Sequence, residues 1–259
     1  MGKRKKKVGI YLLITVCSIC FLYPAIVTLM RSFGVGEEER MSLEGYLAIL
    51  VKERWFLPGF WNSVCYAVVT TVVNGLISLG AACAFRFTQF RGRKLLYFFY
   101  IVLMMMPLQV TLLPNYIGLR EMGLLDTRWA LILPGCFAPF SVFFLCQYMR
   151  GIDTTQMEAA FLETNSLVAV LTQVVLPQIK PCIFAVLLFV FAENWSMVEQ
   201  ADIFLKGEDK LPLTILLTMT EKADGFVLYA GSVIFMIPVV LLYLHFSDSL
   251  EEGVGSIKL

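Results

Sequence analysis

Six long apolar stretches constrain the fold of this chain more than any other feature of its sequence. A helix needs about 20 mainly apolar residues to cross the hydrocarbon core of a bilayer. Inside lipid, backbone N–H and C=O groups find no water to bond, so each stretch is expected to be α-helical. The sequence therefore predicts an all-α polytopic membrane protein with six transmembrane helices, approximately over residues Val8–Met30, Asn62–Phe85, Leu95–Tyr116, Trp129–Met149, Ile179–Trp195 and Phe226–Phe246.

The composition agrees with a chain that lies mostly in lipid. Hydrophobic residues make up 58% of the 259 residues and charged residues 16%, whereas about a quarter of the residues in a soluble domain are charged. The net charge is +1, so the chain has no strong basic field of the kind that attracts nucleic acid. We therefore expect membrane lipid, and no nucleic acid, as a partner.

Basic residues predict the orientation, because loops rich in lysine and arginine remain in the cytoplasm. The head Lys3–Lys7 is entirely basic, and the loop Arg86–Lys94 carries four basic residues and no acidic one. The first apolar run is too long for a cleaved signal peptide and is expected to be a retained anchor. With six crossings, both termini are predicted in the cytoplasm. The expected organisation is a basic head and first helix (1–31), an extracytoplasmic segment (32–61), a five-helix core (62–246) with a cytoplasmic loop (150–178), and a cytoplasmic tail (247–259).

The chain is poor in residues that could carry catalysis or bind a metal. All seven cysteines lie in or beside apolar stretches, and His245 is the only histidine. Cys17 and Cys20 have redox-motif spacing, but with no second pair or histidine cluster nearby we interpret them as small apolar helix residues. No Gly-x-x-x-x-Gly-Lys-Ser/Thr sequence is present, so no nucleotide site of that type is expected. We predict no catalytic, cofactor-binding or metal-binding residue in this chain.

The loop from Arg150 to Gln178 is too long for a simple turn. A short amphipathic helix is predicted over Gln156–Glu163, with Met157, Ala160 and Phe161 on one face at helical spacing. Two interpretations follow from periodicity alone. The helix either rests on lipid headgroups or docks onto a cytoplasmic partner.

Motifs in this loop and beyond it resemble the permeases of ABC importers. Met157-Glu158-Ala159-Ala160, followed by Leu176-Pro177, resembles the EAA loop of that family. The resemblance covers nearly the whole chain and is closest to the sugar-importer branch, in particular the smaller permease of the maltose-type transporters. It extends to Tyr23-Pro24, Asn62-Ser63, Phe90–Lys94, Pro107, Gly123–Thr127, Leu133-Pro134, Pro139-Phe140, and Trp195 followed by Ile203–Leu205.

The resemblance implies a type I ABC importer permease fold in the bacterial cytoplasmic membrane. It implies that the chain forms half of the translocation pore for a solute, expected to be a carbohydrate. A second permease subunit, different from this one by analogy, would form the other half. Two ATPase subunits would bind ATP and magnesium, and an external solute-binding protein would deliver the solute.

The resemblance also assigns a docking segment for the ATPase subunit. In it, Glu158 is expected to make polar contacts, while Ala159 and Ala160 permit close approach. The family usually has glycine at the position of Thr164, and we expect Asn165 to take the turn instead. A further helical stretch is predicted over Leu167–Leu176, ending before Pro177. The docking residues are Gln156, Met157, Glu158, Ala159, Ala160, Phe161, Leu162, Glu163, Thr164 and Asn165.

Polar residues within the apolar stretches are candidates for the translocation path. Such residues are costly at membrane depth and usually face a cavity or a partner helix. The alternative is that they form hydrogen bonds between helices. The candidates are Gln109, Thr111 and Asn115 in the third stretch, and Glu193 and Asn194 in the fifth.

Three alternatives remain open from the sequence. An ABC permease for a solute other than a sugar would share every motif above. A secondary transporter driven by an ion gradient would require paired ionisable residues at the midplane, and Glu193 has no obvious partner there. A membrane-embedded enzyme would require a nucleophile with a base or a metal cluster, and His245 stands alone on its helix.

Overall fold

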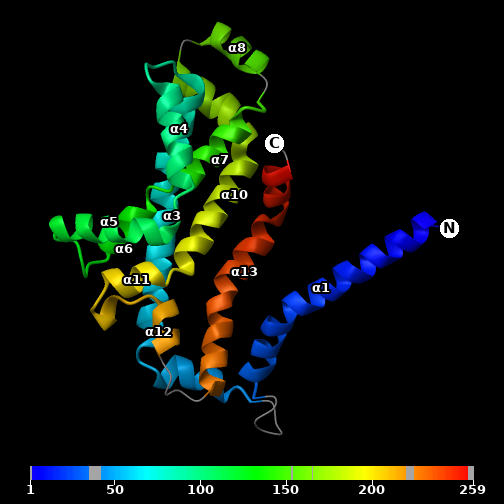
Figure 1. The fold of residues 1–259 in the computed structure, drawn as a ribbon, viewed down its shortest axis with the longest axis vertical. Coiled ribbons are helices and arrows are strands. Elements are labelled where there is room, and N and C mark those ends of the chain that lie inside the picture. The colour runs from blue at the N-terminus through cyan, green and yellow to red at the C-terminus, as the bar shows by residue number, and fades with distance from the viewer. Residues whose placement is uncertain (1, 35–41, 153, 165, 220–224, 256–259) are drawn as a thin grey trace. The chain divides into compact units, whose positions relative to one another are not determined.

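The computed structural model describes residues 2–34, 42–152, 154–164, 166–219 and 225–255. Throughout these ranges the regular elements are helices, as predicted, and none is a strand (Figure 1). The α-helices are α1 (Gly2–Ser32), α2 (Glu44–Leu47), α3 (Phe56–Phe87), α4 (Arg93–Met104), α5 (Leu108–Glu121), α6 (Trp129–Gly135), α7 (Pro139–Met149), α8 (Thr154–Glu163), α9 (Leu167–Val170), α10 (Leu176–Trp195), α11 (Glu199–Phe204), α12 (Leu213–Met219) and α13 (Gly225–Gly255). Three short turns join them: the π-turns η1 (Ala48–Lys52) and η2 (Leu171–Val175), and the 3-10 turn η3 (Glu208–Lys210).

Within the described residues, five helical segments are long and apolar enough to cross a membrane. A sixth crossing exists if the bent pair α4 and α5 is counted as one span. When the bent pair is counted as one span, the structure has the predicted six. The five single segments, apart from the bent pair, are Ile10–Ser32, Phe56–Phe87, Trp129–Met149, Val168–Trp195 and Gly225–Glu251.

The third span is not the single helix that we predicted over Leu95–Tyr116. The chain bends by 105° between α4 and α5, and Pro107 at the bend has an extended backbone with φ −65° and ψ 149°. Proline has no N–H to donate to the preceding turn, so a helix ends more easily at that position than at any other. The new helix then starts directly after Pro107.

The fifth span is longer than predicted, and the predicted end before Pro177 is wrong. The helical run begins at Val168, passes through η2 and continues to Trp195. Pro177 lies in the first turn of α10, directly after η2. The π-turn just before it gives the backbone the local adjustment that the proline ring requires.

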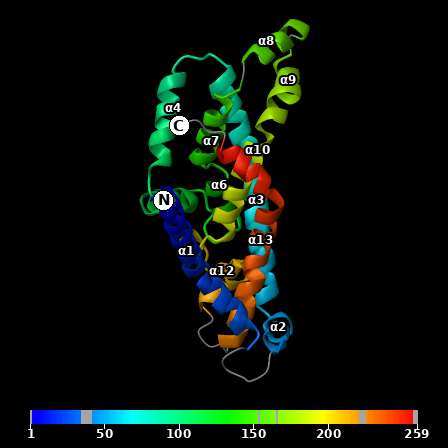
Figure 2. The same cartoon turned by 90° about the vertical axis from the view of Figure 1, so that its right-hand side faces the viewer.

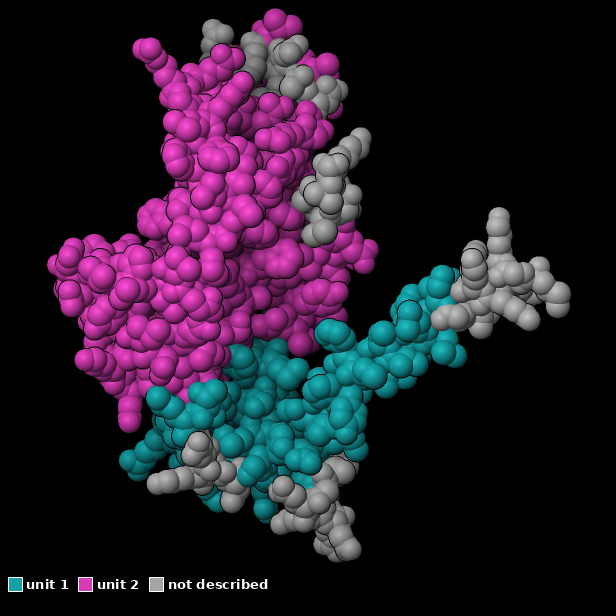
Figure 3. Space-filling view, viewed as in Figure 1, with its two compact units in different colours: residues 1–58, 216–238 teal, residues 59–215, 239–259 magenta. Residues whose placement is uncertain are grey.

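The chain forms two compact units, coloured separately in Figure 3. One contains residues 1–58 and 216–238, and the other contains residues 59–215 and 239–259. In the first unit, Arg31 Nη1 donates to the Tyr229 hydroxyl at 2.8 Å, and the hydroxyl groups of Ser32 and Tyr46 are 2.7 Å apart. These contacts connect the end of α1 to α2 and to the start of α13.

The second unit contains the main apolar core. The core lies where α7 and α10 pack together, with the end of α3 beside them (Figures 1 and 2). Its buried members recur every three or four residues, as expected for one face of each helix. They include Val142, Leu145, Cys146 and Met149 from α7, and Ile179, Cys182, Val186 and Val190 from α10.

Gly135 at the end of α6 permits a close approach between helices of this unit. A Cβ at this position would lie 2.6 Å from Thr70 Cγ2 and 2.7 Å from Asn194 Oδ1. We predict that Gly135→Ala destabilises the protein by about 1–3 kcal/mol, because these neighbours would have to move. Thermal unfolding in detergent measures the effect.

Gly118→Ala is the matched control, since a Cβ at Gly118 would meet nothing within 4 Å. Equal melting temperatures for the two variants would show that the close contact at Gly135 does not limit packing.

Candidate functional site

The loop between α7 and α10 contains α8, which occupies the position of the predicted amphipathic helix. Asn165 and the side chains of Met157, Glu158 and Phe161 lie outside the described residues. Of the side chains that are described, those of Gln156, Ala159, Leu162 and Glu163 are exposed. Leu162 is 90% exposed, which is unfavourable in water for a leucine unless another surface covers it. Ala160 is half-buried and packs against the core cluster.

One side-chain hydrogen bond and helix packing connect α8 to the rest of the second unit. Gln178 Nε2 donates to Gln156 Oε1 at 3.1 Å and to the Val174 carbonyl at 2.9 Å. α8 also contacts α9 and η2. The exposed face of α8 is therefore presented on a supported helix.

Thr164 closes α8 without the backbone conformation that glycine would supply. Among the described non-glycine residues, Asp126 is the one with positive φ, so Thr164 is not left-handed. Its hydroxyl oxygen accepts the N–H of Ser166 at 3.2 Å, and the Ser166 hydroxyl oxygen accepts the N–H of Ala169 at 3.3 Å. Side chains that bond backbone N–H groups in this way substitute for a tight backbone turn and cap the next helix.

The five candidate path residues differ in burial and in their hydrogen-bond partners. Gln109 Nε2 lies 3.3 Å from Glu199 Oε2 at the start of α11, whereas the Thr111 hydroxyl donates to the Leu108 carbonyl at 2.9 Å. Asn115 is half-buried. Glu193 is exposed, whereas Asn194 is buried and donates to the Val190 carbonyl at 2.8 Å.

Glu199 is not among the predicted path residues. The Gln109–Glu199 contact joins residues 90 positions apart, and no local pattern could have revealed it. A role of the five residues in translocation stays a prediction.

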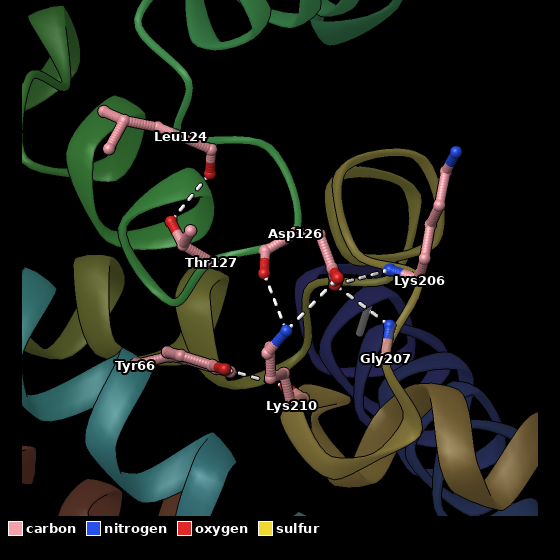
Figure 4. Close-up of polar contacts among 7 residues, drawn as sticks. All are labelled: Tyr66, Leu124, Asp126, Thr127, Lys206, Gly207 and Lys210. Atoms are coloured by element: carbon pink, nitrogen blue, oxygen red, sulfur yellow. Dashed lines mark hydrogen bonds and ion pairs between the residues drawn. The ribbon is translucent and has the colours of Figure 1, made fainter.

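A second polar cluster joins two connecting segments of the second unit (Figure 4). Asp126 Oδ1 accepts the N–H groups of Lys206 and Gly207 at 3.0 and 2.9 Å. Lys210 Nζ lies 3.2 Å from Asp126 Oδ2 and 2.8 Å from the Asp126 carbonyl oxygen. The Tyr66 hydroxyl donates to the Lys210 carbonyl at 2.7 Å, which attaches the cluster to α3.

Hydrogen bonds explain the acidity of Asp126. The N–H of Gly207, then that of Lys206, then the Lys210 ammonium lower the pKa of the Asp126 carboxyl to about 2. Each contact stabilises the ionised form. Asp126 belongs to the Gly123–Thr127 motif, but no sequence signal identified Lys206 or Lys210 as its partners.

We predict that Asp126→Asn lowers the melting temperature by a few degrees at pH 7. Because the pKa in the folded state is below its ordinary value, the ionised carboxylate contributes stability above about pH 4 and loses it as the pH falls toward 2. The difference between the wild type and the variant should therefore shrink over that range in thermal unfolding measured from pH 7 to pH 2.

Asp202→Asn removes the same charge from an exposed position on the neighbouring helix α11 and should leave the melting temperature nearly unchanged. If the melting temperature of Asp126→Asn lies below that of the wild type by the same amount at every pH, the lowered pKa of Asp126 is contradicted.

No three histidine, cysteine or acidic side chains that could hold a metal gather anywhere in the described part of the chain. The helical spans define the class of the protein, a multi-pass membrane protein with a supported helix between two of its spans. Over residues 76–255 the sequence matches the family described as binding-protein-dependent transport system inner membrane component. The chain belongs to that family, whose members are transport subunits.

Individual relatives agree with the family. The chain is 26% identical to the arabinooligosaccharides transport system permease protein AraQ of Halalkalibacterium halodurans, over 86% of this chain and 82% of that protein. It is 30% identical to the osmoprotective compounds uptake permease protein GgtD of Synechocystis, over 77% of this chain and 70% of that protein. It is 28% identical to the diacetylchitobiose uptake system permease protein NgcG of Streptomyces coelicolor, over 94% and 85%.

A solved structure shows the same fold. A chain of a bacterial ABC transporter involved in the import of the acidic polysaccharide alginate superposes with a TM-score of 0.81. The two chains are 22% identical, and the match covers 96% of this chain and 97% of that one. The predicted type I ABC importer permease fold is confirmed.

Proposed function

We propose that this chain is one of two transmembrane subunits of an ATP-driven importer that takes up a carbohydrate. ATPase subunits bind ATP and magnesium, and an external binding protein delivers the solute. Both termini and α8 lie on the cytoplasmic side. Membership of the binding-protein-dependent family supports the importer class, and relatives named for arabinooligosaccharide and diacetylchitobiose uptake support the cargo class.

The observation that carries the proposal is the exposed face of α8. Leu162 is 90% exposed and Ala159 is exposed beside it on the same helix. Covering the Leu162 side chain with an apolar cleft would stabilise a complex by about 1.5–3 kcal/mol. The small side chain of Ala159 permits close approach. Gln156, bonded to Gln178, holds the helix in place. The docking surface therefore comprises the described part of the segment from Gln156 to Thr164, and the proposal extends it to Met157, Glu158, Phe161 and Asn165.

Pull-down of the ATPase subunit tests the docking surface. We predict that Leu162→Asp lowers the amount of ATPase that co-purifies with the tagged chain by about tenfold or more, because a carboxylate cannot enter an apolar cleft without losing its hydration. The companion permease should still co-purify. Mass spectrometry of the complex from gentle detergent measures both.

Met122→Asp is the matched control, because Met122 is an exposed apolar side chain (57%) outside the docking segment. If the correctly inserted wild-type chain brings down no ATPase, the importer assignment fails. If Leu162→Asp retains the ATPase as well as Met122→Asp does, α8 is not the docking helix.

The path proposal rests on Gln109 and Glu199, which come together on α5 and α11. Both side chains are exposed and can exchange their mutual hydrogen bond for one to a sugar hydroxyl. Glu193, exposed on α10, is available to the same path or to the second permease subunit. We predict that Gln109→Ala lowers uptake several-fold in reconstituted vesicles, as expected when one polar contact to a solute is removed.

Leu113→Ala serves as the control, since Leu113 is exposed on the same helix (65%) and apolar. Unchanged uptake by Gln109→Ala, with normal ATPase assembly, would remove Gln109 from the path.

A second candidate function is uptake of an osmoprotective compound by the same importer architecture. The relative named for osmoprotective compounds is 30% identical to this chain. Uptake assays with labelled oligosaccharides and with a labelled compatible solute, run on the same vesicles, discriminate the two.

A further inference from the structure

A basic pocket lies where three helices of the second unit meet their connecting segments. Phe85 and Arg86 come from the end of α3, and Cys146 and Arg150 from the end of α7. The start of α4 completes the pocket, which has a volume of about 250 Å³. Figures 1 and 2 show these helix ends toward the end of the unit that carries α8.

Four cations line the pocket, and the structure shows none of them paired with a described carboxylate. Lys210 and Asp126 form the one ion pair found among the described residues. Like charges held close together repel, more strongly where protein replaces water. An anion in the pocket would therefore be stabilised by every one of them. The four cations that line the pocket are Arg86, Arg93, Lys94 and Arg150.

Backbone and ring contacts hold three of these cations in place. Arg86 Nε donates to the Met149 carbonyl at 3.2 Å, and Arg93 Nη1 donates to the Thr88 carbonyl at 2.9 Å. The Arg150 guanidinium lies 5.7 Å from the centre of the Tyr97 ring. Each guanidinium has five N–H groups, so most donors of Arg86 and Arg93 remain for a ligand.

The Tyr97 hydroxyl is an independent sign of a ligand. Tyr97 lines the pocket, and its buried hydroxyl has no hydrogen-bond partner among the described residues. A buried polar atom of this kind is uncommon in folded proteins and requires a partner. The polar side chains of the pocket thus offer donors almost exclusively. An acceptor-rich anion with several oxygens, such as a phosphate group, matches that set.

The position of the pocket indicates where the phosphate comes from. Large apolar side chains of α4 are exposed next to it, among them Leu95 (61%), Phe98 (58%) and Phe99 (52%). In a membrane-spanning helix such side chains face acyl chains, so the first turn of α4, which carries Arg93 and Lys94, lies near the headgroups. Basic pockets between transmembrane helices recognise anionic lipid headgroups.

We propose that the pocket between α3, α4 and α7 binds a phosphate group, and that the group belongs to an anionic phospholipid of the adjacent leaflet. Arg93 and Lys94 hold the phosphate oxygens from one side, and Arg86 and Arg150 from the other. The Tyr97 hydroxyl donates the remaining hydrogen bond. This site is separate from α8 and does not depend on the proposed cargo.

Lipid binding to the delipidated, intact importer complex tests the proposal. The probes are dioctanoyl phosphatidylglycerol, dioctanoylglycerol, which has the same chains without phosphate, and inorganic phosphate. We expect phosphatidylglycerol to bind, Lys94→Gln and Tyr97→Phe to weaken it about threefold or more each, and the double variant to weaken it about tenfold. Dioctanoylglycerol should bind weakly and equally to every variant.

Arg91→Gln is the matched control. Arg91 is exposed in the same connecting segment but does not line the pocket. Equal losses for Arg91→Gln and Lys94→Gln would show attraction to a diffuse basic surface and overturn the pocket. Unchanged phosphatidylglycerol binding in the double variant Lys94→Gln/Tyr97→Phe would also overturn the pocket. If Lys94→Gln fails to assemble, Tyr97→Phe, which keeps every charge, decides alone.

Inorganic phosphate separates the two sources of the group. If it binds as tightly as phosphatidylglycerol and is lost in the same variants, the phosphate site stands and the lipid source is overturned. If phosphatidylglycerol binds at least tenfold more tightly than inorganic phosphate, the acyl chains contribute and the lipid source is supported.

Discussion

In hydrocarbon, a backbone N–H has no bonding partner except the chain itself, and the structure depends on this constraint. Every long apolar segment is helical because only a helix satisfies its own backbone. Two of the prolines lie where this requirement is easiest to meet. Pro107 and Pro139 lie just before or within the first turn of α5 and α7, where a missing donor costs least. The breaks before α5 and α7 fall at these two prolines.

Within the second unit, the helices approach each other through small and polar side chains as well as large apolar ones. Gly135 lies against Thr70 and Asn194, and Asn74 Nδ2 donates to the carbonyl oxygens of Gly135 and Cys136 at 3.3 and 3.2 Å. These carbonyls lie at the break between α6 and α7, where they have lost their helical partners. Asn74 therefore supplies from α3 the donor that the interrupted helix lacks, which is how a broken span is tolerated at membrane depth.

Much of this architecture could be predicted from the sequence, because hydrophobicity and proline act locally. The spans, the short helix after Arg150 and the family resemblance all follow from neighbouring residues. The 105° bend at Pro107 could not be predicted from the sequence, since proline permits angles from a slight kink to a full break. The role of Thr164 also depended on a hydroxyl finding the Ser166 N–H. The partners of Gln109 and Asp126 lie 80 to 90 residues away, where only tertiary structure could bring them together.

The uninterrupted helical run from Val168 to Trp195 has a mechanical consequence. Its 28 residues span about 42 Å at 1.5 Å per residue, and its first turns contact α8. The π-turn η2 lies near that end, and π-turns are points of local adjustment within a helix. A rotation of about 5° at η2 would displace Trp195, about 30 Å away, by about 2.5 Å. A small rearrangement at the η2 end of the span would thereby be magnified at the Trp195 end without any change in the helix between them.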